Sequence, residues 1–161
     1  MSTAFALLGL MAAPAIASAQ STANADATVN ATVIAALTIT NDNGLDFGQV
    51  AKGASYTVDA KTGATAAKWT VGGEAGASIS VSYDASIPLV AGTDTITVTP
   101  DVAGSATDTQ SGATTLASGD SGTLDATTGA YYVWMGGSLT VPSAVAAGAY
   151  TGTATLTVTY N

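Results

Sequence analysis

The sequence contains neither cysteine nor histidine, and its basic side chains are limited to three lysines. Without cysteine, the chain can form neither a disulfide nor a thiolate metal site. Lys52, Lys61 and Lys68 are set against eleven acidic residues, which gives a formal net charge of −8. Nucleic acids and anionic membranes attract clusters of basic residues. The charge balance therefore argues against both classes of partner.

The missing histidine also argues against catalysis. Residues 119–122 read GDSG, the sequence around the nucleophilic serine of chymotrypsin-like proteases, but that serine needs a histidine as its base. Glu74 is the only glutamate, so the chain does not suggest the paired carboxylates of a glycosidase. We expect that the protein is not an enzyme and that it binds no cofactor.

The composition favours strands over helices. Threonine, alanine, glycine, valine and serine dominate, and only 9% of the residues are charged. β-branched residues are enriched in strands, whereas surface helices need the Leu, Glu, Lys and Arg that are scarce in this chain. A length of 161 residues suits one domain. We therefore expect a single all-β domain.

The N-terminus has the features of a secretory signal peptide. Residues 4–17 are almost entirely apolar, and Ala17, Ser18 and Ala19 fit the small-x-small rule for cleavage before Gln20. The apolar run is shorter than the ~20 residues that a transmembrane helix needs. We expect residues 1–19 to be a signal peptide and the mature chain to be secreted, with no insertion into a membrane.

Two stretches at opposite ends of the mature chain alternate between apolar and polar residues, as a strand with one buried face does. In residues 23–33 the candidate core-facing residues are Ala23, Ala25, Ala27, Val29, Ala31 and Val33. In residues 150–161 they are Tyr150, Gly152, Ala154, Leu156, Val158 and Tyr160. The second stretch has neither the proline nor the charge that protects an edge strand. We therefore expect another strand to pair with it.

Between these ends, short strand-like segments alternate with turn residues, which is typical of a β-sandwich. The apolar phase slips at residues 34–36, so residues 34–40 are expected to form a separate element. Turn-forming residues predict a turn at 41–44 and a long loop at 103–128, within which TLA (115–117) or TLD (123–125) could form a weak hairpin. The other expected strands are residues 45–50, 55–60, 67–73, 76–84, 94–102 and 130–142.

One cluster of oxygen-bearing side chains is a candidate calcium site. Asn41, Asp42, Asn43 and Asp46 surround Gly44 in the sequence, and Ca²⁺ prefers carboxylate and carbonyl oxygen ligands. Asn, Asp and Gly are also the residues that β-turns prefer. We favour the turn and leave calcium binding open.

Aromatic residues suggest a second candidate site. Tyr131, Tyr132 and Trp134 could form a platform for a sugar ring. Strand alternation places Tyr132 and Trp134 on one face and Tyr131 on the other. At least one of these faces must then belong to the core.

Five segments carry a resemblance that covers nearly the whole mature chain: LTIT (37–40), LDFGQV (45–50), WTVGGEAGASISVSY (69–83), GGSLTVP (136–142) and GAYTGTATLTVTY (148–160). Together they resemble a bacterial pilin-like family of unknown function, related to spore coat protein U and to the archaic chaperone–usher pilins. This resemblance implies an incomplete immunoglobulin-like β-sandwich that lacks its last strand. The N-terminal extension of a neighbouring subunit would supply the missing strand, which is a form of β-strand addition.

The resemblance also assigns roles to the two alternating stretches. Residues 20–33 would be the donor-strand extension, and residues 34–161 the pilin-like sandwich. Tyr160 matches the penultimate aromatic residue of many such pilins, whose final strand is offered to a periplasmic chaperone. The groove edge and chaperone-facing strand would comprise Tyr150, Ala154, Leu156, Val158 and Tyr160.

The implied assembly is a homopolymer. Because donor and acceptor occupy different surfaces, the contact is head-to-tail and propagates as a fibre. The expected location is the cell surface, reached through the periplasm. Archaic pilins commonly carry a disulfide, which this chain lacks, so the need for a periplasmic chaperone and an outer-membrane usher is left open. The alternative is a monomeric surface carbohydrate-binding or adhesin module, in which residues 23–33 fold back and the aromatic strand meets the ligand.

Overall fold

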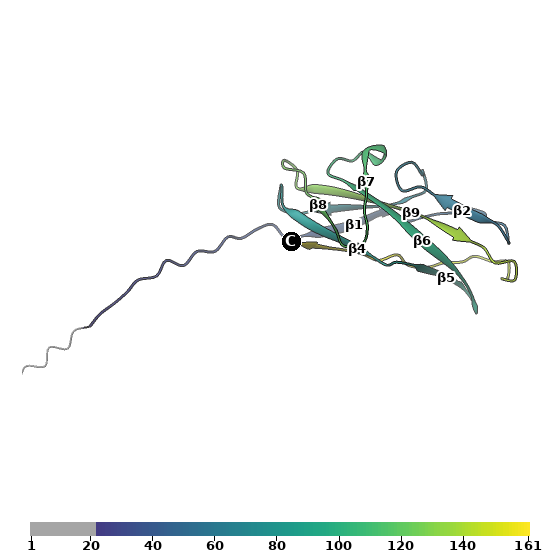
Figure 1. The fold of residues 1–161 in the computed structure, drawn as a ribbon, viewed down its shortest axis with the longest axis horizontal. Helices are drawn as coiled ribbons and strands as arrows, with labels where there is room; N and C mark the ends of the chain where they lie inside the picture. Colours follow the sequence, from purple (N-terminus) through teal and green to yellow (C-terminus); the bar gives the residue numbers. More distant parts are fainter. Residues whose placement is uncertain (1–21) are drawn as a thin grey trace, which may run out of the picture. The chain divides into compact units, whose positions relative to one another are not determined.

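The computed structural model describes residues 22–161 (Figure 1). The chain divides into two units after Thr32, and the residues from Val33 onward form one compact unit. Residues 22–37 contain no regular secondary structure. The predicted signal peptide, residues 1–19, lies outside the described residues. Among residues 22–161, no helix is long and apolar enough to cross a membrane.

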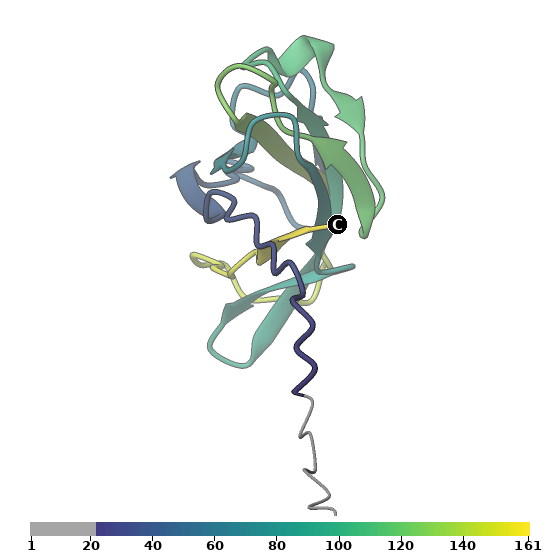
Figure 2. The ribbon, with the colours of Figure 1, turned by 90° about the vertical axis from the view of Figure 1, so that its left-hand side faces the viewer.

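The unit that begins at Val33 is all-β, as the composition predicts, and forms a sandwich of two antiparallel sheets (Figures 1 and 2). The larger sheet has the order β1 (Thr38–Asn43), β3 (Ala67–Gly72), β9 (Ala130–Thr140), β6 (Asp94–Ser105) and β5 (Ile87–Ala91). Two short strands join it, since β2 (Ser55–Val58) pairs with β9 and β7 (Thr114–Thr115) pairs with β6. A 3₁₀ turn, η1 (Gln110–Gly112), precedes β7.

The smaller sheet has the order β10 (Leu156–Tyr160), β4 (Ser78–Tyr83) and β8 (Asp120–Thr123). Its central strand shows why the sequence forms a sandwich. In β4, Ile79 and Val81 are fully buried, whereas the serines that alternate with them, Ser78, Ser80 and Ser82, are at least partly exposed. A period of two places alternate residues on opposite faces of a strand, so the apolar face of β4 packs on the larger sheet.

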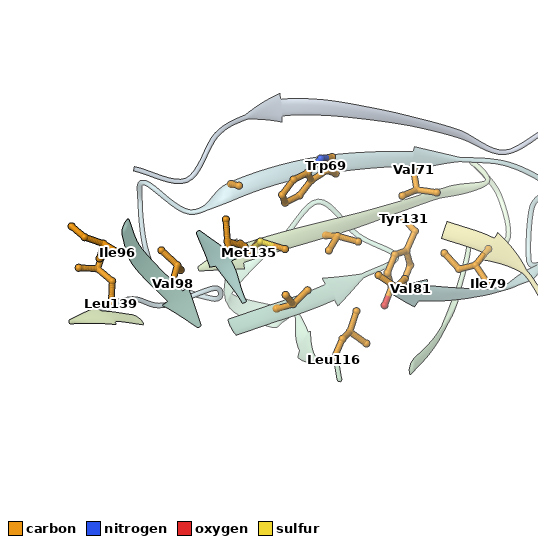
Figure 3. Close-up of a cluster of buried hydrophobic side chains, with 14 of the residues drawn as sticks. Trp69, Val71, Ile79, Val81, Ile96, Val98, Leu116, Tyr131, Met135 and Leu139 are labelled. Carbon is orange, nitrogen blue, oxygen red and sulfur yellow. The ribbon is translucent and has the colours of Figure 1, made fainter. Parts of the chain in front are cut away.

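The core fills the space between the sheets. Its members include Trp69 and Val71 from β3, Tyr131 and Met135 from β9, and Leu116 from the segment before β8. Ile96, Val98 and Leu139 lie at one end of this cluster, and Ile79 and Val81 lie toward the other (Figure 3).

Strand β9 lies between β3 and β6, and both of its faces are covered. Tyr131, Val133 and Met135 face the main core, while Trp134 packs in a second cluster with Ala60, Ala103 and Ala113. Along one edge, β9 pairs with β3 as far as Met135 and with β2 from Gly137 onward. Between them, a Cβ at Gly136 would collide with the backbone of Val58. Glycine therefore allows this change of partner.

Three sequence predictions of local structure between residues 41 and 128 are wrong. Residues 41–44 are not a turn, because β1 continues to Asn43 with an irregularity between Asn41 and Asn43. The Asn41 amide donates to the carbonyls of Asn43 (3.0 Å) and Lys68 (3.2 Å), so this turn-forming residue stabilises a bulge instead. Residues 45–50 form no regular strand. Residues 103–128 are not one loop, since they contain the end of β6, η1, β7 and β8.

Small residues and proline explain two of the elements that the sequence pattern did not indicate. Gly122 of β8 lies against the ring of Tyr131, which leaves no room for a Cβ. A weakly apolar segment can therefore form a strand. Strand β5 contains Pro88 and lies at the edge of the larger sheet, where proline is tolerated because no ladder hydrogen bond is needed on its outer side.

Candidate functional site

A cavity of about 1170 Å³ opens into one end of the core. Its lining includes Trp69, Ile87, Ile96, Val98 and Leu139, all of which belong to the main hydrophobic cluster. Apolar side chains at the bottom of a cavity favour an apolar occupant, because burial removes their surface from water. The cavity lies between two chain segments, residues 44–50 and residues 147–154, which form its walls.

The first wall, residues 44–50, is attached only lightly to the larger sheet. Leu45, Phe47 and Val50 are half-buried against the core. The backbone N–H of Asp46 donates to the carbonyl of Thr65 (3.0 Å), and the Asp46 carboxylate accepts from the N–H of Gly48 (2.7 Å). The segment is thus held by a turn and by apolar contacts, without a strand ladder. Residues 45–50 therefore form no strand, because no neighbouring strand pairs with their backbone.

The second wall, residues 147–154, is fixed by contacts with β5. The backbones of Val90 and Thr151 exchange hydrogen bonds of 2.8 and 3.3 Å. The Tyr150 hydroxyl donates to the carbonyl of Ala146 (2.9 Å) and lies 3.4 Å from the Asp94 carboxylate. Desolvation and this carboxylate raise the pKa of Tyr150, because both disfavour the phenolate. This wall is therefore better ordered by hydrogen bonds than the first.

Beyond the cavity, strand β10 is also only partly covered. The residues predicted to face the core, Tyr150, Ala154, Leu156, Val158 and Tyr160, are all half-buried and pack against the main cluster, while the threonines between them are exposed. Within residues 22–161, β10 pairs with β4 along one edge and with no strand along the other. The inward-facing residues agree with the predicted alternation, but the predicted strand over residues 150–161 is too long: only Leu156–Tyr160 form a strand, and Thr151 bridges to Val90 of β5. The apolar face of β10 is only half covered.

Strand β1 shows the same incomplete burial on the other side of the opening. Ile39 lies opposite the core residue Val71, yet 44% of Ile39 is exposed. Asn41, opposite Trp69, lines the cavity. We call the whole opening between residues 38–50 and residues 150–160 the open seam. It leaves core-facing side chains of both sheets in contact with solvent.

The end of the seam away from the cavity is closed by Tyr160. Its hydroxyl donates to the carbonyl of Ala35 (2.8 Å) and accepts from the N–H of Glu74 (2.7 Å). The N–H of Ala35 in turn donates to the Glu74 carboxylate (2.9 Å). We call these three residues the clasp. Together they fix the position at which the chain enters the sandwich.

The predicted donor residues are exposed throughout. Residues 22–36 are exposed, with exposed fractions of 91% for Val29 and 94% for Val33. The predicted donor residues in this stretch are Ala23, Ala25, Ala27, Val29, Ala31 and Val33.

Residues of the two other candidate sites make contacts within the sandwich. Tyr131 and Trp134 are only 5% and 4% exposed, and the Lys68 ammonium lies 5.1 Å from the ring centre of Tyr132. These contacts leave little aromatic surface for a sugar. Among the described residues, no three acidic side chains gather in one place. Asp42 instead accepts from the Thr70 hydroxyl (2.7 Å).

Sequence reasoning missed the floor and the first wall of the cavity. The apolar residues that line the floor and the first wall were assigned to strands. The alternation of a strand shows which face is apolar, but it does not show whether the rest of the fold covers that face. Sequence reasoning also missed Glu74, which lies far from both ends of the chain in sequence. The sequence signal that does point to one wall of the cavity is the alternation that begins at Tyr150.

Comparison with known proteins adds the family. No curated protein matches the chain. The family model described as "Domain of unknown function (DUF4402)" matches residues 37–160, which covers the two sheets, both walls of the cavity and the open seam. The chain therefore belongs to the DUF4402 family.

Proposed function

We propose that the protein is a secreted structural subunit that polymerises head-to-tail by donor-strand complementation into a surface fibre. The observation that carries this proposal is the open seam, where core side chains of both sheets remain accessible beside an unpaired strand edge. The proposed occupant is the alternating stretch 23–33 of a second copy. On this proposal a periplasmic chaperone would cover the same seam before assembly.

The order of the strands supports a missing partner for β10. In an immunoglobulin constant-type sandwich, one sheet has the order A-B-E-D and the other contains C, F and G. If β1, β3, β4, β6, β9 and β10 are lettered A to F in chain order, the larger sheet contains the order A-B-E-D. The smaller sheet then has F (β10) beside C (β4). The position of strand G, next to β10, is the one that the seam leaves open.

The patterns of donor and acceptor also agree. Residues 23–33 and residues 150–160 both present small or apolar residues at every second position, although only Leu156–Tyr160 of the acceptor form a strand and Thr151 bridges to Val90 of β5. A donor strand would gain ~0.5–1.5 kcal/mol for each ladder hydrogen bond. A buried valine would add ~1.5–3 kcal/mol and an alanine less. Backbone pairing would therefore contribute at least as much as the side chains, with Val29 and Val33 as the main anchors.

Side-chain size favours one direction for the donor. If it runs antiparallel to β10 with the ends aligned, Val29 lies opposite Ala154 and Ala31 opposite Gly152, where the cavity has room. Ala25 and Ala27 then lie opposite the larger Val158 and Leu156. In the parallel direction Val29 meets Leu156, and the cavity receives only alanines. Close packing favours the antiparallel arrangement.

The test is a matched pair of substitutions in the full mature chain. Val29→Asp places a charge in the seam, whereas Asn30→Asp adds the same charge to the opposite face of the strand. We expect filaments in electron micrographs of the wild type and of Asn30→Asp, and at least a tenfold loss for Val29→Asp, because an unpaired charge in an apolar site costs well above about 1.4 kcal/mol. Folded monomers from all three chains would refute the proposal.

A further inference from the structure

The clasp determines where the N-terminal extension is attached relative to the open seam. Ala35 is held by both of its backbone polar groups, since its N–H is bound by Glu74 and its carbonyl by Tyr160. Tyr160 is the last residue of β10 and pairs with Ile79 of β4. The cavity lies at the other end of the seam, beside Tyr150 and Ala154. The extension is therefore attached at the end of the seam that is far from the cavity.

This attachment limits how the chain could fill its own seam. Only Ile34 separates the fixed Ala35 from Val33, so the chain's own extension could enter the seam only at the Tyr160 end. It would then run parallel to β10, with Val33 near Tyr160 and Ala23 near Tyr150. An extension from a second copy has no such limit and can enter at either end.

The parallel direction is the unfavourable one for this sequence. It would place Val29 and Val33 beside Leu156 and Tyr160, where large side chains already occupy the seam, and would leave the cavity to alanines. Parallel pairing is also slightly less stable for each residue than antiparallel pairing. In addition, the extension would have to reverse direction through residues 34–37, while both backbone polar groups of Ala35 are already bonded in the clasp.

We infer that the clasp is a positioning device which denies the open seam to the chain's own extension and so reserves it for a second copy. Tyr160 acts through its hydroxyl, by holding the first residues of the sandwich, and contacts no donor residue itself in this role. The inference rests on the proposed function. The inference adds to the proposed function a reason why each subunit binds the extension of another subunit and does not bind its own.

The absence of cysteine makes a disulfide test possible. Val158 faces the seam from β10 and is half-buried. In the antiparallel arrangement the donor residue opposite Val158 is Ala25, and in the parallel arrangement it is Ala31. A disulfide requires Cα atoms within ~7 Å, whereas residues 25 and 31 of a strand lie roughly 20 Å apart at about 3.3 Å per residue. The two arrangements are therefore distinguishable even if the register shifts by one pair.

Two double variants report the two arrangements under mild oxidation. Ala25→Cys with Val158→Cys is expected to give a ladder of covalent oligomers on a non-reducing gel. Ala31→Cys with Val158→Cys is expected to give little compact, internally linked monomer. Weakening of the clasp by Tyr160→Phe should raise the yield of that linked monomer by about two- to tenfold, the change that corresponds to losing the one hydrogen bond that holds the Ala35 carbonyl.

Two substitutions at Glu74 separate the clasp from general effects. Glu74→Gln keeps an oxygen that can accept from Ala35 and should leave the yield of linked monomer unchanged. Glu74→Ala removes that acceptor and should act like Tyr160→Phe, which keeps the test valid if the tyrosine variant folds poorly. Thermal unfolding of each variant checks that the sandwich remains intact.

The outcomes separate this inference from the proposed function. A ladder from the Ala25 variant, with linked monomer unchanged by Tyr160→Phe and by Glu74→Ala, would overturn the role of the clasp and leave polymerisation standing. Abundant linked monomer from the Ala31 variant with the clasp intact would also overturn it. No ladder from the Ala25 variant, and no filaments from the wild type, would refute the proposed function itself.

Discussion

Ile39 and Val71 lie opposite each other across the β1–β3 pair, yet Val71 is completely buried while 44% of Ile39 is exposed. Residues opposite each other on antiparallel strands point to the same face of a sheet. Both side chains therefore face the interior of the sandwich, and only one of them is covered. The difference measures how far the open seam exposes the core at its edge.

This difference predicts unequal effects of truncation in the dilute monomer. Val71→Ala should lower the free energy of unfolding by roughly 1–3 kcal/mol, because it leaves a cavity in a closed part of the core. Ile39→Ala should cost less, although it removes more atoms, because much of the side chain is already in water. Urea unfolding measures both. Equal or reversed losses would mean that the seam is closed in solution.

Two glycines in the second wall provide a matched pair. A Cβ at Gly152 would collide with the backbone of Pro88 and the side chain of Leu89, whereas a Cβ at Gly148 would meet nothing within 4 Å. Gly152→Ala should therefore destabilise the sandwich by about 1–3 kcal/mol, as overpacking does, and Gly148→Ala should have almost no effect. The melting temperatures of the two variants check this. Similar melting temperatures would contradict the position of the wall against β5.

Much of the fold could be predicted from strand periodicity. The alternation of Ile79 and Val81 with serines, and of Leu156 and Val158 with threonines, places the correct faces inward because the period of a strand is fixed by local geometry. The turn predicted at residues 41–44 failed for a non-local reason. Asn41 bonds to the carbonyl of Lys68 across the strand pair, and no local propensity contains that contact.

The site was predicted less completely than the fold. The sequence indicates which residues of 150–160 face inward, but the empty space beside them depends on elements that come together only in the folded chain. The Tyr160 hydroxyl contacts the carbonyl of Ala35 across 125 positions of sequence. Strand β5 was missed because Pro88 argues against a strand, although an edge position tolerates it.

Two turns with nearly the same sequence predict how stability depends on acid. These turns are DAKTG (59–63) and DATTG (125–129). In the first, the Asp59 carboxylate accepts from the N–H groups of Lys61 and Thr62 and from the Thr62 hydroxyl. In the second, the Asp125 carboxylate accepts from the N–H groups of Thr127 and Thr128 and from the Thr128 hydroxyl. In both turns, backbone hydrogen bonds hold the pKa of the aspartate, Asp59 or Asp125, below its ordinary value of 3.8, and the threonine hydroxyl lowers it further. These bonds stabilise the charged form in the folded state.

The sign of the effect follows from linkage. A carboxyl group whose pKa is lower in the folded chain contributes stability that is fully present well above pH 3.8 and is lost as the pH falls through the folded value. The melting temperature should therefore decrease when the pH is lowered below about 4. The double variant Asp59→Asn with Asp125→Asn should have a lower melting temperature than the wild type at pH 7. Its melting temperature should also decrease less when the pH is lowered. An unchanged acid dependence in that variant would show that these turns contribute little.

The last prediction concerns a free donor strand. A synthetic peptide of residues 22–34 should bind the open seam of the Val29→Asp chain, because it supplies the apolar face that this variant lacks. A ligand that binds only the folded state raises stability by RT ln(1 + [L]/Kd), about 2.7 kcal/mol at a hundredfold excess over Kd. The melting temperature should thus rise with peptide concentration. A peptide with Val29→Asp and Val33→Asp is the matched control, since it keeps the length and every backbone hydrogen-bond donor and acceptor. If both peptides raise the melting temperature equally, the seam does not discriminate apolar side chains, and the exposed valines of the extension need another explanation.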